Sequence, residues 1–177
     1  MKSCEGIDSL DIDVEISCDL LESPIGFVEI MGSKGCLVGI HLCASDQQPR
    51  KSHVFRQDID LMKETRYQLE SYFSSELTSF DLPIDPNGTP FQIRVWRSLL
   101  EIPYGETWSY GELARRVGNS KAARAVGLAN NRNPISIVIP CHRVIGSDGT
   151  LKGYGGGVEK KSYLLELERS VASARQS

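Results

Sequence analysis

Two helix-start signals in the second half of the chain constrain its fold most. Thr89-Pro90-Phe91-Gln92 matches a capping box, in which Thr and the residue three positions on bind each other's backbone N–H groups, and proline takes the first helical position. Ser109-Tyr110-Gly111-Glu112 repeats the pattern, and Gly118-Asn119 can end that helix. The predicted helices cover residues 90–100, 109–118 and, with Ser120 as the cap, 121–130.

The last two of these helices form a candidate helix-turn-helix. Helix pairs joined by a glycine-containing turn are also common in proteins that never bind DNA. The third helix is rich in small residues around one long cation, Arg124. Small side chains let a helix approach another surface closely, which fits either packing in a core or insertion into a DNA groove. In the second case Arg124 would fill a gap in the base stack.

The stretch that follows carries the predicted chemistry. The β-branched run over residues 135–139 is typical of a strand buried on both faces, and Pro140 cannot continue a strand ladder. Cys141 is therefore predicted at the exit of a buried strand, directly before His142. A neighbouring imidazole can assist thiolate formation, directly or through a water. Buried free cysteine is also a common core residue, so the pair alone fits catalysis or packing.

The first half predicts a small antiparallel sheet and one helix. Turn signals at Ser23-Pro24 and over residues 32–35 separate its apolar segments. An amphipathic pattern over residues 59–73 predicts a helix, and the proline-containing stretch 81–88 predicts a linker. The predicted strands cover residues 16–21, 26–31 and 37–42.

Charge differs sharply between the halves. The net charge is −3, but residues 1–90 carry 7 Lys and Arg against 16 Asp and Glu, whereas residues 91–177 carry 13 against 7. The second half therefore has a net charge of +6, against −9 for the first. A basic half that also holds Cys141 fits a surface for a polyanion, and solvated surface charge explains it equally well.

The 5 cysteines are scattered and odd in number, which fits free thiols in a reducing compartment better than a disulfide framework. The N-terminus lacks the pattern of a signal peptide, and no apolar run reaches the roughly 18 residues of a membrane span. We therefore expect an intracellular protein without a membrane partner. Cys36 and Cys43 lie near His41, but their odd separation places them on opposite sides of a strand, so no metal site is predicted.

Several motifs occur in one order along the second half. They are Thr89-Pro90-Phe91, Tyr104-Gly105-Glu106, Ser109-Tyr110, Lys121-Ala122-Ala123-Arg124-Ala125-Val126-Gly127, Asn133-Pro134-Ile135, Ile139-Pro140-Cys141-His142-Arg143-Val144 and Gly153-Tyr154-Gly155-Gly156-Gly157. In this order and spacing they resemble the O6-alkylguanine-DNA alkyltransferases, and most closely the stand-alone bacterial type. The resemblance is dense from about residue 88 to 168 and loose in the acidic first half.

The resemblance implies an α+β fold with a ribonuclease-H-like domain over residues 1–85, a helical helix-turn-helix (winged-helix-like) domain over 86–170 and a polar tail over 171–177. It implies DNA repair by a methylated-DNA-protein-cysteine methyltransferase, which flips O6-alkylguanine, or O4-alkylthymine, out of double-stranded DNA from the minor-groove side. The alkyl group then moves irreversibly to a cysteine. It also implies no cofactor, a monomer whose cooperativity on DNA stays open, and a cytoplasmic location, or a nuclear one in a eukaryote.

The same resemblance implies the roles of the reacting groups. Cys141 is the acceptor nucleophile, His142 takes its proton through a water, and Glu168 orients the histidine. On the helix predicted over residues 158–169, Glu168 falls one turn after Leu164, on an apolar face. A carboxylate there needs a partner if it is buried, although a solvated glutamate is the commoner outcome.

The remaining implied roles concern the DNA. Tyr110 donates to a ring nitrogen of the leaving guanine, Arg124 fills the vacated stack, and Asn133 braces the turn before Cys141. Taken alone, Tyr110 and Asn133 also fit a helix-start aromatic and a loop amide, and the glycine run fits a flexible linker. The resemblance places Ala123, Ala125 and Gly127 on the groove-facing surface, and Ser136, Val144, Tyr154, Gly155 and Gly156 around the alkylguanine.

Two positions depart from the family pattern. Gly156 stands where some members have a bulky aromatic residue, so we expect larger alkyl groups to enter. Ser136 stands where others have a proline that packs on benzyl groups, which leaves acceptance of benzyl substrates open.

Three functions from different classes remain at this point: a single-turnover DNA alkyltransferase, a lesion-recognition protein without transfer chemistry, and a cysteine hydrolase. Cys141 argues against the second, because the recognition-only relatives replace this cysteine. The third lacks any recognisable hydrolase motif in the sequence.

Overall fold

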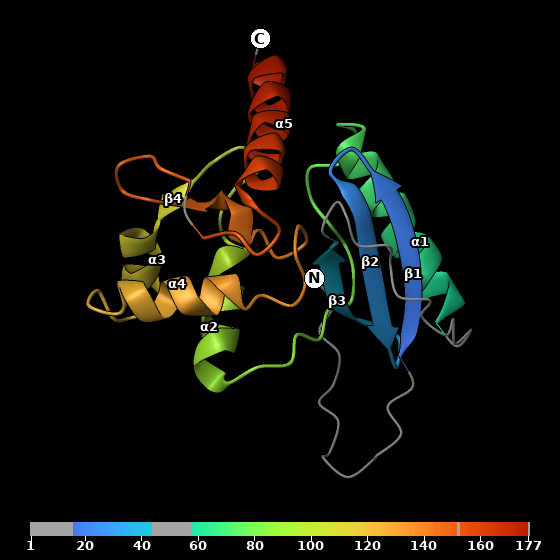
Figure 1. Ribbon diagram of the computed structural model, residues 1–177, viewed down its shortest axis with the longest axis horizontal. Helices are drawn as coiled ribbons and strands as arrows, with labels where there is room; N and C mark the ends of the chain where they lie inside the picture. The colour runs from blue at the N-terminus through green and yellow to red at the C-terminus, as the bar shows by residue number, and fades with distance from the viewer. Residues whose placement is uncertain (1–15, 44–57, 152, 177) are drawn as a thin grey trace. The chain divides into compact units, whose positions relative to one another are not determined.

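The computed structural model describes residues 16–43, 58–151 and 153–176. The chain divides into two compact units, Met1–Pro86 and Asn87–Ser177 (Figure 1). The expected domain boundary after residue 85 lies one residue from this division. A small sheet with one helix in the first unit and a mainly helical second unit confirm the predicted α+β fold.

The first unit is an antiparallel meander covered by a helix. Strands β1 (Ser17–Ser23), β2 (Gly26–Ser33) and β3 (Cys36–Leu42) pair in the order β1-β2-β3. Helix α1 (Ile59–Phe73) packs on one face of this sheet (Figure 1). Lys34 and Gly35 join β2 to β3 with φ angles of 52° and 76°, as a tight two-residue hairpin turn requires. The predicted meander and helix are confirmed.

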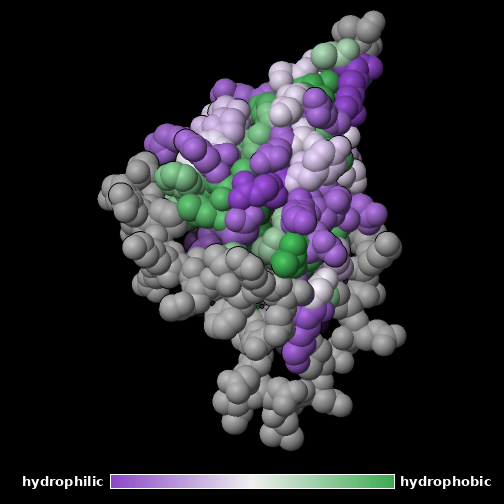
Figure 2. Space-filling view, turned by 90° about the vertical axis from the view of Figure 1, so that its right-hand side faces the viewer, coloured by the Kyte–Doolittle hydropathy of each residue, from purple (hydrophilic) through white to green (hydrophobic). Residues whose placement is uncertain are grey.

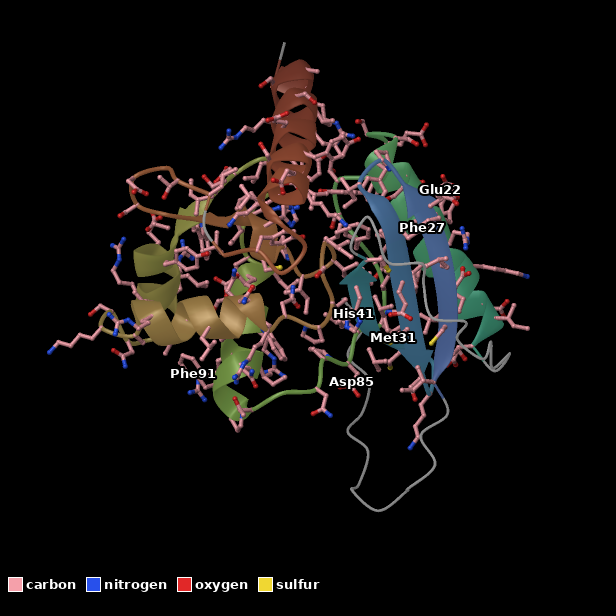
Figure 3. All side chains as sticks on the ribbon, in the orientation of Figure 1. Glu22, Phe27, Met31, His41, Asp85 and Phe91 are labelled. Carbon is pink, nitrogen blue, oxygen red and sulfur yellow. The ribbon has the colours of Figure 1, made fainter. Side chains whose placement is uncertain are left out.

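Along each strand, successive side chains point alternately to the two faces of the sheet. Val28, Ile30 and Ile40 are fully buried, and so are Leu69 and Tyr72 of α1. These side chains form the core between sheet and helix. The opposite face carries Glu22, Phe27, Met31 and His41 (Figure 3).

The stretch predicted as a linker is partly bound to the sheet. The Leu37 N–H donates to Pro83 O at 2.8 Å, and the Asp85 N–H donates to Leu37 O at 2.9 Å. Leu82 is fully buried. The prediction of a linker over residues 81–88 is therefore wrong for 82–85, because a buried leucine and two backbone hydrogen bonds fix this segment along β3.

The second unit packs helices around a short loop that holds Cys141. Helices α2 and α3 both pack on α4, and α5 contacts the 3₁₀ turn η1 (Figure 1). Two short strands, β4 and β5, pair in parallel. The elements are α2 (Pro90–Leu99), β4 (Trp108–Ser109), α3 (Tyr110–Arg116), α4 (Ala123–Asn131), η1 (Cys141–Arg143), β5 (Val144–Ile145) and α5 (Val158–Gln176).

Both predicted capping boxes are confirmed. At the start of α2, the Thr89 N–H donates to Gln92 Oε1 at 2.8 Å and the Gln92 N–H donates to Thr89 Oγ1 at 3.3 Å. At the start of α3, the Ser109 N–H donates to Glu112 Oε2 at 2.6 Å and the Glu112 N–H donates to Ser109 Oγ at 3.1 Å. Reciprocal bonds of this kind satisfy N–H groups that the helices leave unpaired.

The start of α4 differs from the prediction. The helix begins at Ala123, and its cap residue is Ala122, whose N–H donates to Asn119 O at 2.9 Å. Ser120 is therefore not the cap, because a turn held by Asn119 comes between it and the helix. The Asn119 side chain accepts from the Lys121 N–H at 3.1 Å. The turn chemistry of asparagine thus outweighs the capping preference of serine.

Helix α5 is longer than predicted. It continues from Val158 to Gln176, and Val171 is buried at 9% exposure. The prediction of a separate polar tail over residues 171–177 is therefore wrong as far as residue 176. A buried valine two residues beyond the expected end gives the helix further core contact.

The cysteines are not all free. Cys36 is disulfide-bonded, whereas Cys18 and Cys141 are free thiols. The expectation of free thiols is wrong at Cys36, and Cys4 lies outside the described residues. Within the described ranges, no three His, Cys, Asp or Glu side chains come together as a metal site would need.

No helix in the described part of the chain is long and apolar enough to cross a membrane. The face displayed in Figure 2 is largely hydrophilic where residues are coloured, with hydrophobic residues in small groups between hydrophilic ones.

We expect Thr89→Ala to lower the free energy of unfolding by about 1 kcal/mol, because it removes one half of the capping box. Urea denaturation followed by circular dichroism measures this change. Thr89→Ser keeps the hydroxyl and is the matched control, with most of the stability retained. An equal loss in both variants would show that the hydroxyl does not stabilise α2.

Candidate active site

The loop before Cys141 is a pair of tight turns. The Val138 N–H donates to Ser136 O at 2.9 Å around Ile137, whose φ is 71°. The Cys141 N–H donates to Ile139 O at 2.8 Å around Pro140, whose φ is −81° and ψ 62°. These are two γ-turns of opposite hand. The prediction of a buried strand over residues 135–139 is therefore wrong, because local turns take the hydrogen bonds that a ladder would use.

Asn133 holds this loop in place. Its Nδ2 donates to Ile139 O at 2.8 Å and to Ile135 O at 3.4 Å, and its Oδ1 accepts from the Ile135 N–H at 3.1 Å. A positive φ at a β-branched residue such as Ile137 is strained and persists only where the surroundings fix it. The side chain of Asn133 supplies part of that fixation, so it braces the turn geometrically.

Cys141 begins η1 and is only 4% exposed. Burial raises the pKa of its thiol, whereas Asn133 and the positive charge of Lys161 lower that pKa. The resting group is therefore a neutral thiol that needs a base. The same two neighbours favour the thiolate once the proton has left.

His142 is a neutral imidazole with a defined proton position. Its side chain is fully buried, and burial lowers its pKa although Glu168 opposes this effect. Nε2 lies 2.9 Å from Glu168 Oε1, so the ring proton belongs on Nε2, where a carboxylate can accept it. Nδ1 is buried and meets no hydrogen-bond partner among the described residues. Nδ1 therefore keeps a lone pair that can accept a proton.

Glu168 is a buried carboxylate with several donors. Arg143 donates to it through Nε at 2.8 Å and Nη2 at 3.0 Å, and the Gly105 N–H donates at 3.1 Å. Burial alone would raise its pKa, but the hydrogen bonds from His142 and Arg143 and the charge of Arg143 lower the pKa to about 2. The sequence left open whether this glutamate is solvated, and the structure buries it completely.

Lys161 and Arg143 are site residues that sequence reasoning did not assign. Lys161 is fully buried, and its Nζ donates to Val144 O at 2.6 Å. Burial lowers its pKa, and the charge of Cys141 raises it. The sequence does contain an indication that Lys161 belongs to the site. Lys161 lies seven positions before Glu168 and so shares a face of α5 with it. A lysine in a charged helix otherwise looks like a solvent-facing residue.

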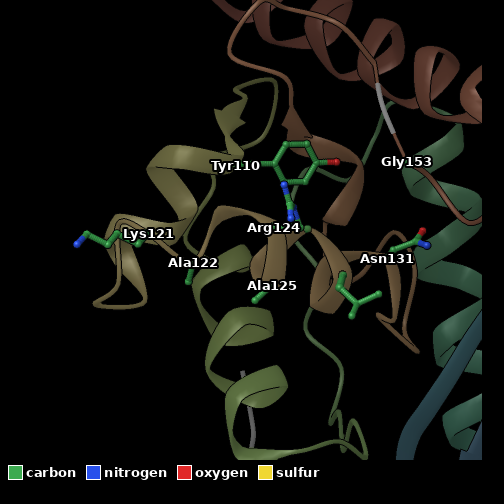
Figure 4. A pocket seen from close by; sticks show the side chains of 9 residues that line it. Tyr110, Lys121, Ala122, Arg124, Ala125, Asn131 and Gly153 are labelled. Atoms are coloured by element: carbon green, nitrogen blue, oxygen red, sulfur yellow. The ribbon is translucent and has the colours of Figure 1, made fainter.

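A groove of about 740 Å³ lies along α4 and the start of α3 (Figure 4). Of the predicted DNA-binding residues, Tyr110, Arg124, Ala125 and Gly127 line it, and Ala123 does not. The groove also contains residues that the sequence did not single out. These are Lys121, Ala122, Leu128, Asn131 and Gly153.

Tyr110 lines the groove and lies within electrostatic range of Cys141. A Cβ on Gly127 would meet the Tyr110 ring at 3.6 Å, an ordinary van der Waals contact, so the ring lies directly beside α4. Burial raises the pKa of Tyr110, and the nearby charge of Cys141 raises it further. The hydroxyl therefore stays protonated at neutral pH and can donate a hydrogen bond.

The glycine-rich loop is a folded turn. The Gly157 N–H donates to Tyr154 O at 3.0 Å, and Gly153 and Gly157 have φ angles of 56° and 95°. The Tyr154 hydroxyl is buried with no hydrogen-bond partner in the described part of the chain. Burial raises the pKa of Tyr154 well above its usual value. Of the other residues expected around the alkylguanine, Val144 is buried, Ser136 and Gly156 are half-buried, and Gly155 is exposed.

Comparison with known proteins places both units in one family. The model described as the DNA binding domain of 6-O-methylguanine DNA methyltransferase matches residues 90–170, and that of its ribonuclease-like domain matches residues 16–86. The methylated-DNA-protein-cysteine methyltransferase of Mycobacterium tuberculosis is 49% identical over 154 residues, or 87% of this chain and 93% of that protein. The one of Methanosarcina acetivorans is 48% identical over 151 residues, or 85% and 97%.

Solved structures agree. The crystal structure of the M. tuberculosis O6-methylguanine methyltransferase has a TM-score of 0.78 at 46% identity, and covers 88% of this chain and 94% of that one. The crystal structure of M. tuberculosis OGT in complex with DNA has a TM-score of 0.76 at 47% identity, and covers 86% and 92%.

Fold and site together define a helix-turn-helix protein with a buried cysteine next to a histidine and carboxylate pair. This chain belongs to the 6-O-methylguanine DNA methyltransferase family. The resemblance found in the sequence is thereby confirmed.

The acid stability of the fold should depend on Glu168. Its pKa is about 2 when folded, against 4.5 as the ordinary value, so its stabilisation is present above pH 4.5 and is lost as the pH falls towards 2. The shift corresponds to about 3 kcal/mol. The Glu168→Gln variant has no carboxylate to protonate. The difference in free energy of unfolding between the wild type and this variant should therefore shrink as the pH falls over this range.

Urea denaturation at a series of pH values measures that difference. Glu166→Gln, at an exposed position of the same helix, is the control. At every pH its free energy of unfolding should differ from that of the wild type by less than the free energy of Glu168→Gln does. A constant difference for Glu168→Gln from pH 5 to 2 would contradict the assigned ionisation of Glu168.

Proposed function

We propose that this chain repairs O6-alkylguanine, and O4-alkylthymine, in double-stranded DNA by one irreversible transfer of the alkyl group to Cys141 Sγ. The observation that carries the proposal is the buried thiol beside a neutral imidazole whose Nδ1 is unpaired among the described residues. That thiol lies within electrostatic range of Tyr110, which lines the groove on α4. Family membership supports repair of alkylated DNA as the overall activity.

In the proposed reaction His142 is the base. Its Nδ1 takes the Cys141 proton through one water, and the positive ring is stabilised by Glu168 across the 2.9 Å contact. The thiolate attacks the alkyl carbon, a C–S bond forms, and the bond from that carbon to guanine O6 breaks. Guanine leaves with a proton at a ring nitrogen, supplied through the Tyr110 hydroxyl. The overall exchange is one thiol proton for one alkyl group.

The product is a thioether, which cellular thiols do not reverse. Cys141 cannot be regenerated in this way, so each molecule acts once. No metal or cofactor is needed for this balance, because the thiol and the lesion supply all the atoms that move.

Recognition of the lesion follows from extrusion of the base. A badly paired base costs the least to flip, which favours the lesion without reading the sequence around it. Arg124 is exposed on α4 and lines the groove, so we assign it to the gap in the stack. The small residues Ala123, Ala125 and Gly127 let α4 approach the minor groove closely.

Tyr154 and the glycines after it form the proposed wall of the pocket, together with Val144 and Ser136. Gly156 carries no side chain to narrow this wall, so alkyl groups larger than methyl should enter. We propose that the protein works as a monomer in the compartment that holds the DNA.

The first test is intact-protein mass spectrometry after incubation with excess duplex that contains O6-methylguanine. We expect a gain of one methylene per molecule, located on Cys141 by peptide mapping. Cys18 is a free thiol in the same protein and serves as an internal control that stays unmodified. Cys141→Ala should bind the duplex and gain no mass.

No gain of mass despite tight binding would support a recognition-only protein. Neither transfer nor binding would reopen a hydrolase function for the Cys141 and His142 pair.

Arg124→Ala should reduce the transfer rate at saturating DNA by about tenfold or more, because flipping loses part of its compensating contact. Single-turnover kinetics measure the rate. Arg97→Ala removes an exposed cation from α2, outside the groove lining, and is the matched control with a near-normal rate. A normal rate in Arg124→Ala would remove the assignment of Arg124 to the base stack.

A further inference from the structure

We infer that Asn130 is a positioning residue for transfer to Cys141. The inference rests on the proposed function and adds to it a group that acts through the backbone of the nucleophile. Asn130 lies in the last turn of α4 and is 1% exposed. Its side chain neither lines the groove nor belongs to the histidine and carboxylate pair.

The contact joins α4 to the nucleophile. Asn130 Nδ2 donates to Cys141 O at 3.3 Å. The carbonyl sets the orientation of the amide, because the opposite orientation would place two acceptors against each other. The same helix carries Arg124, six positions earlier. One rigid element therefore holds both the residue assigned to the DNA and the peptide of the reacting cysteine.

Folding does not require this contact. The Cys141 carbonyl already accepts a hydrogen bond from the Val144 N–H, so it would keep a donor without Asn130. The amide itself is poorly satisfied, because Asn130 Oδ1 is buried and has no hydrogen-bond partner in the described ranges. A buried acceptor without a partner destabilises the fold, so an apolar side chain of the same size should suit this position at least as well.

A costly buried amide that touches the reacting residue is better explained by function than by stability. In-line displacement requires the sulfur, the alkyl carbon and the leaving oxygen to be nearly collinear at close approach. The Cα–Cβ direction of Cys141 follows from the orientation of its peptide. By holding the Cys141 carbonyl, Asn130 fixes where Sγ points relative to a base brought in by α4.

The test compares two substitutions that each remove a buried, unsatisfied polar group. Asn130→Leu is nearly isosteric and removes the contact to Cys141. Thr65→Val is the matched control, because Thr65 is fully buried on α1 in the first unit and its Oγ1 also lacks a partner among the described residues. Asn130→Met provides a second variant whose flexible side chain adapts to the same space.

Three properties are measured for each full-length protein: the melting temperature, the dissociation constant for duplex with O6-methylguanine, and the single-turnover transfer rate at saturating DNA. All variants should melt at or above the wild-type temperature. The Asn130 variants should transfer the methyl group about 10- to 100-fold more slowly, with DNA affinity and the shape of the pH–rate profile unchanged. Thr65→Val should transfer at the wild-type rate.

A wild-type rate in Asn130→Leu or Asn130→Met with the fold retained would overturn the inference. Unfolding of both variants would overturn it as well, because the amide would then be a stabilising contact. Failure of the proposed function is distinct, since in that case the wild-type protein itself would transfer no methyl group.

Discussion

Burial of a charged carboxylate is costly unless donors surround it, and Glu168 meets this requirement with donors from separate parts of the second unit. His142 and Arg143 reach it from η1, and the Gly105 N–H reaches it from the turn after α2. Removing any one of these donors would leave part of the carboxylate charge unpaired in the protein interior. This one carboxylate therefore joins α5 to the segment that carries Cys141 and sets the proton position on His142. It also fixes Arg143, whose Nη1 donates to Ile102 O at 2.7 Å.

The loop over residues 135–141 shows how the proposed nucleophile can be buried and held in a fixed orientation. A strand would have satisfied its backbone through neighbours in a sheet. Here the side chain of Asn133 supplies these bonds, and the loop can turn sharply at Ile137 and Pro140. Cys141 consequently stands in a dry environment that keeps the thiol neutral, close to Lys161, which favours the thiolate.

Local signals predicted the helices of the second unit because capping residues act within one turn. Thr89 and Ser109 make the bonds that the sequence requires. Predictions failed where tertiary packing decides. An apolar β-branched run is buried either as strand or as turn, and only Asn133 distinguishes the two outcomes. Asn130 escaped notice because a lone polar residue in a helix carries no mark of burial, and Lys161 because a lysine on the same face as Glu168 resembles a solvent-facing residue. Their roles, like those of the predicted site residues, depend on which groups the fold brings next to them.

Helix α5 has a further consequence for changes in chain length. Lys161 and Glu168 are seven positions apart, about two helical turns, so both face the site only while their spacing is kept. Deleting one residue between them would rotate one relative to the other by about 100° and turn a buried charge towards solvent or core. The exposed turn at residues 147–149 has no such requirement. Insertions and deletions should thus be tolerated in that turn and rejected within the first three turns of α5, whatever side chains they contain.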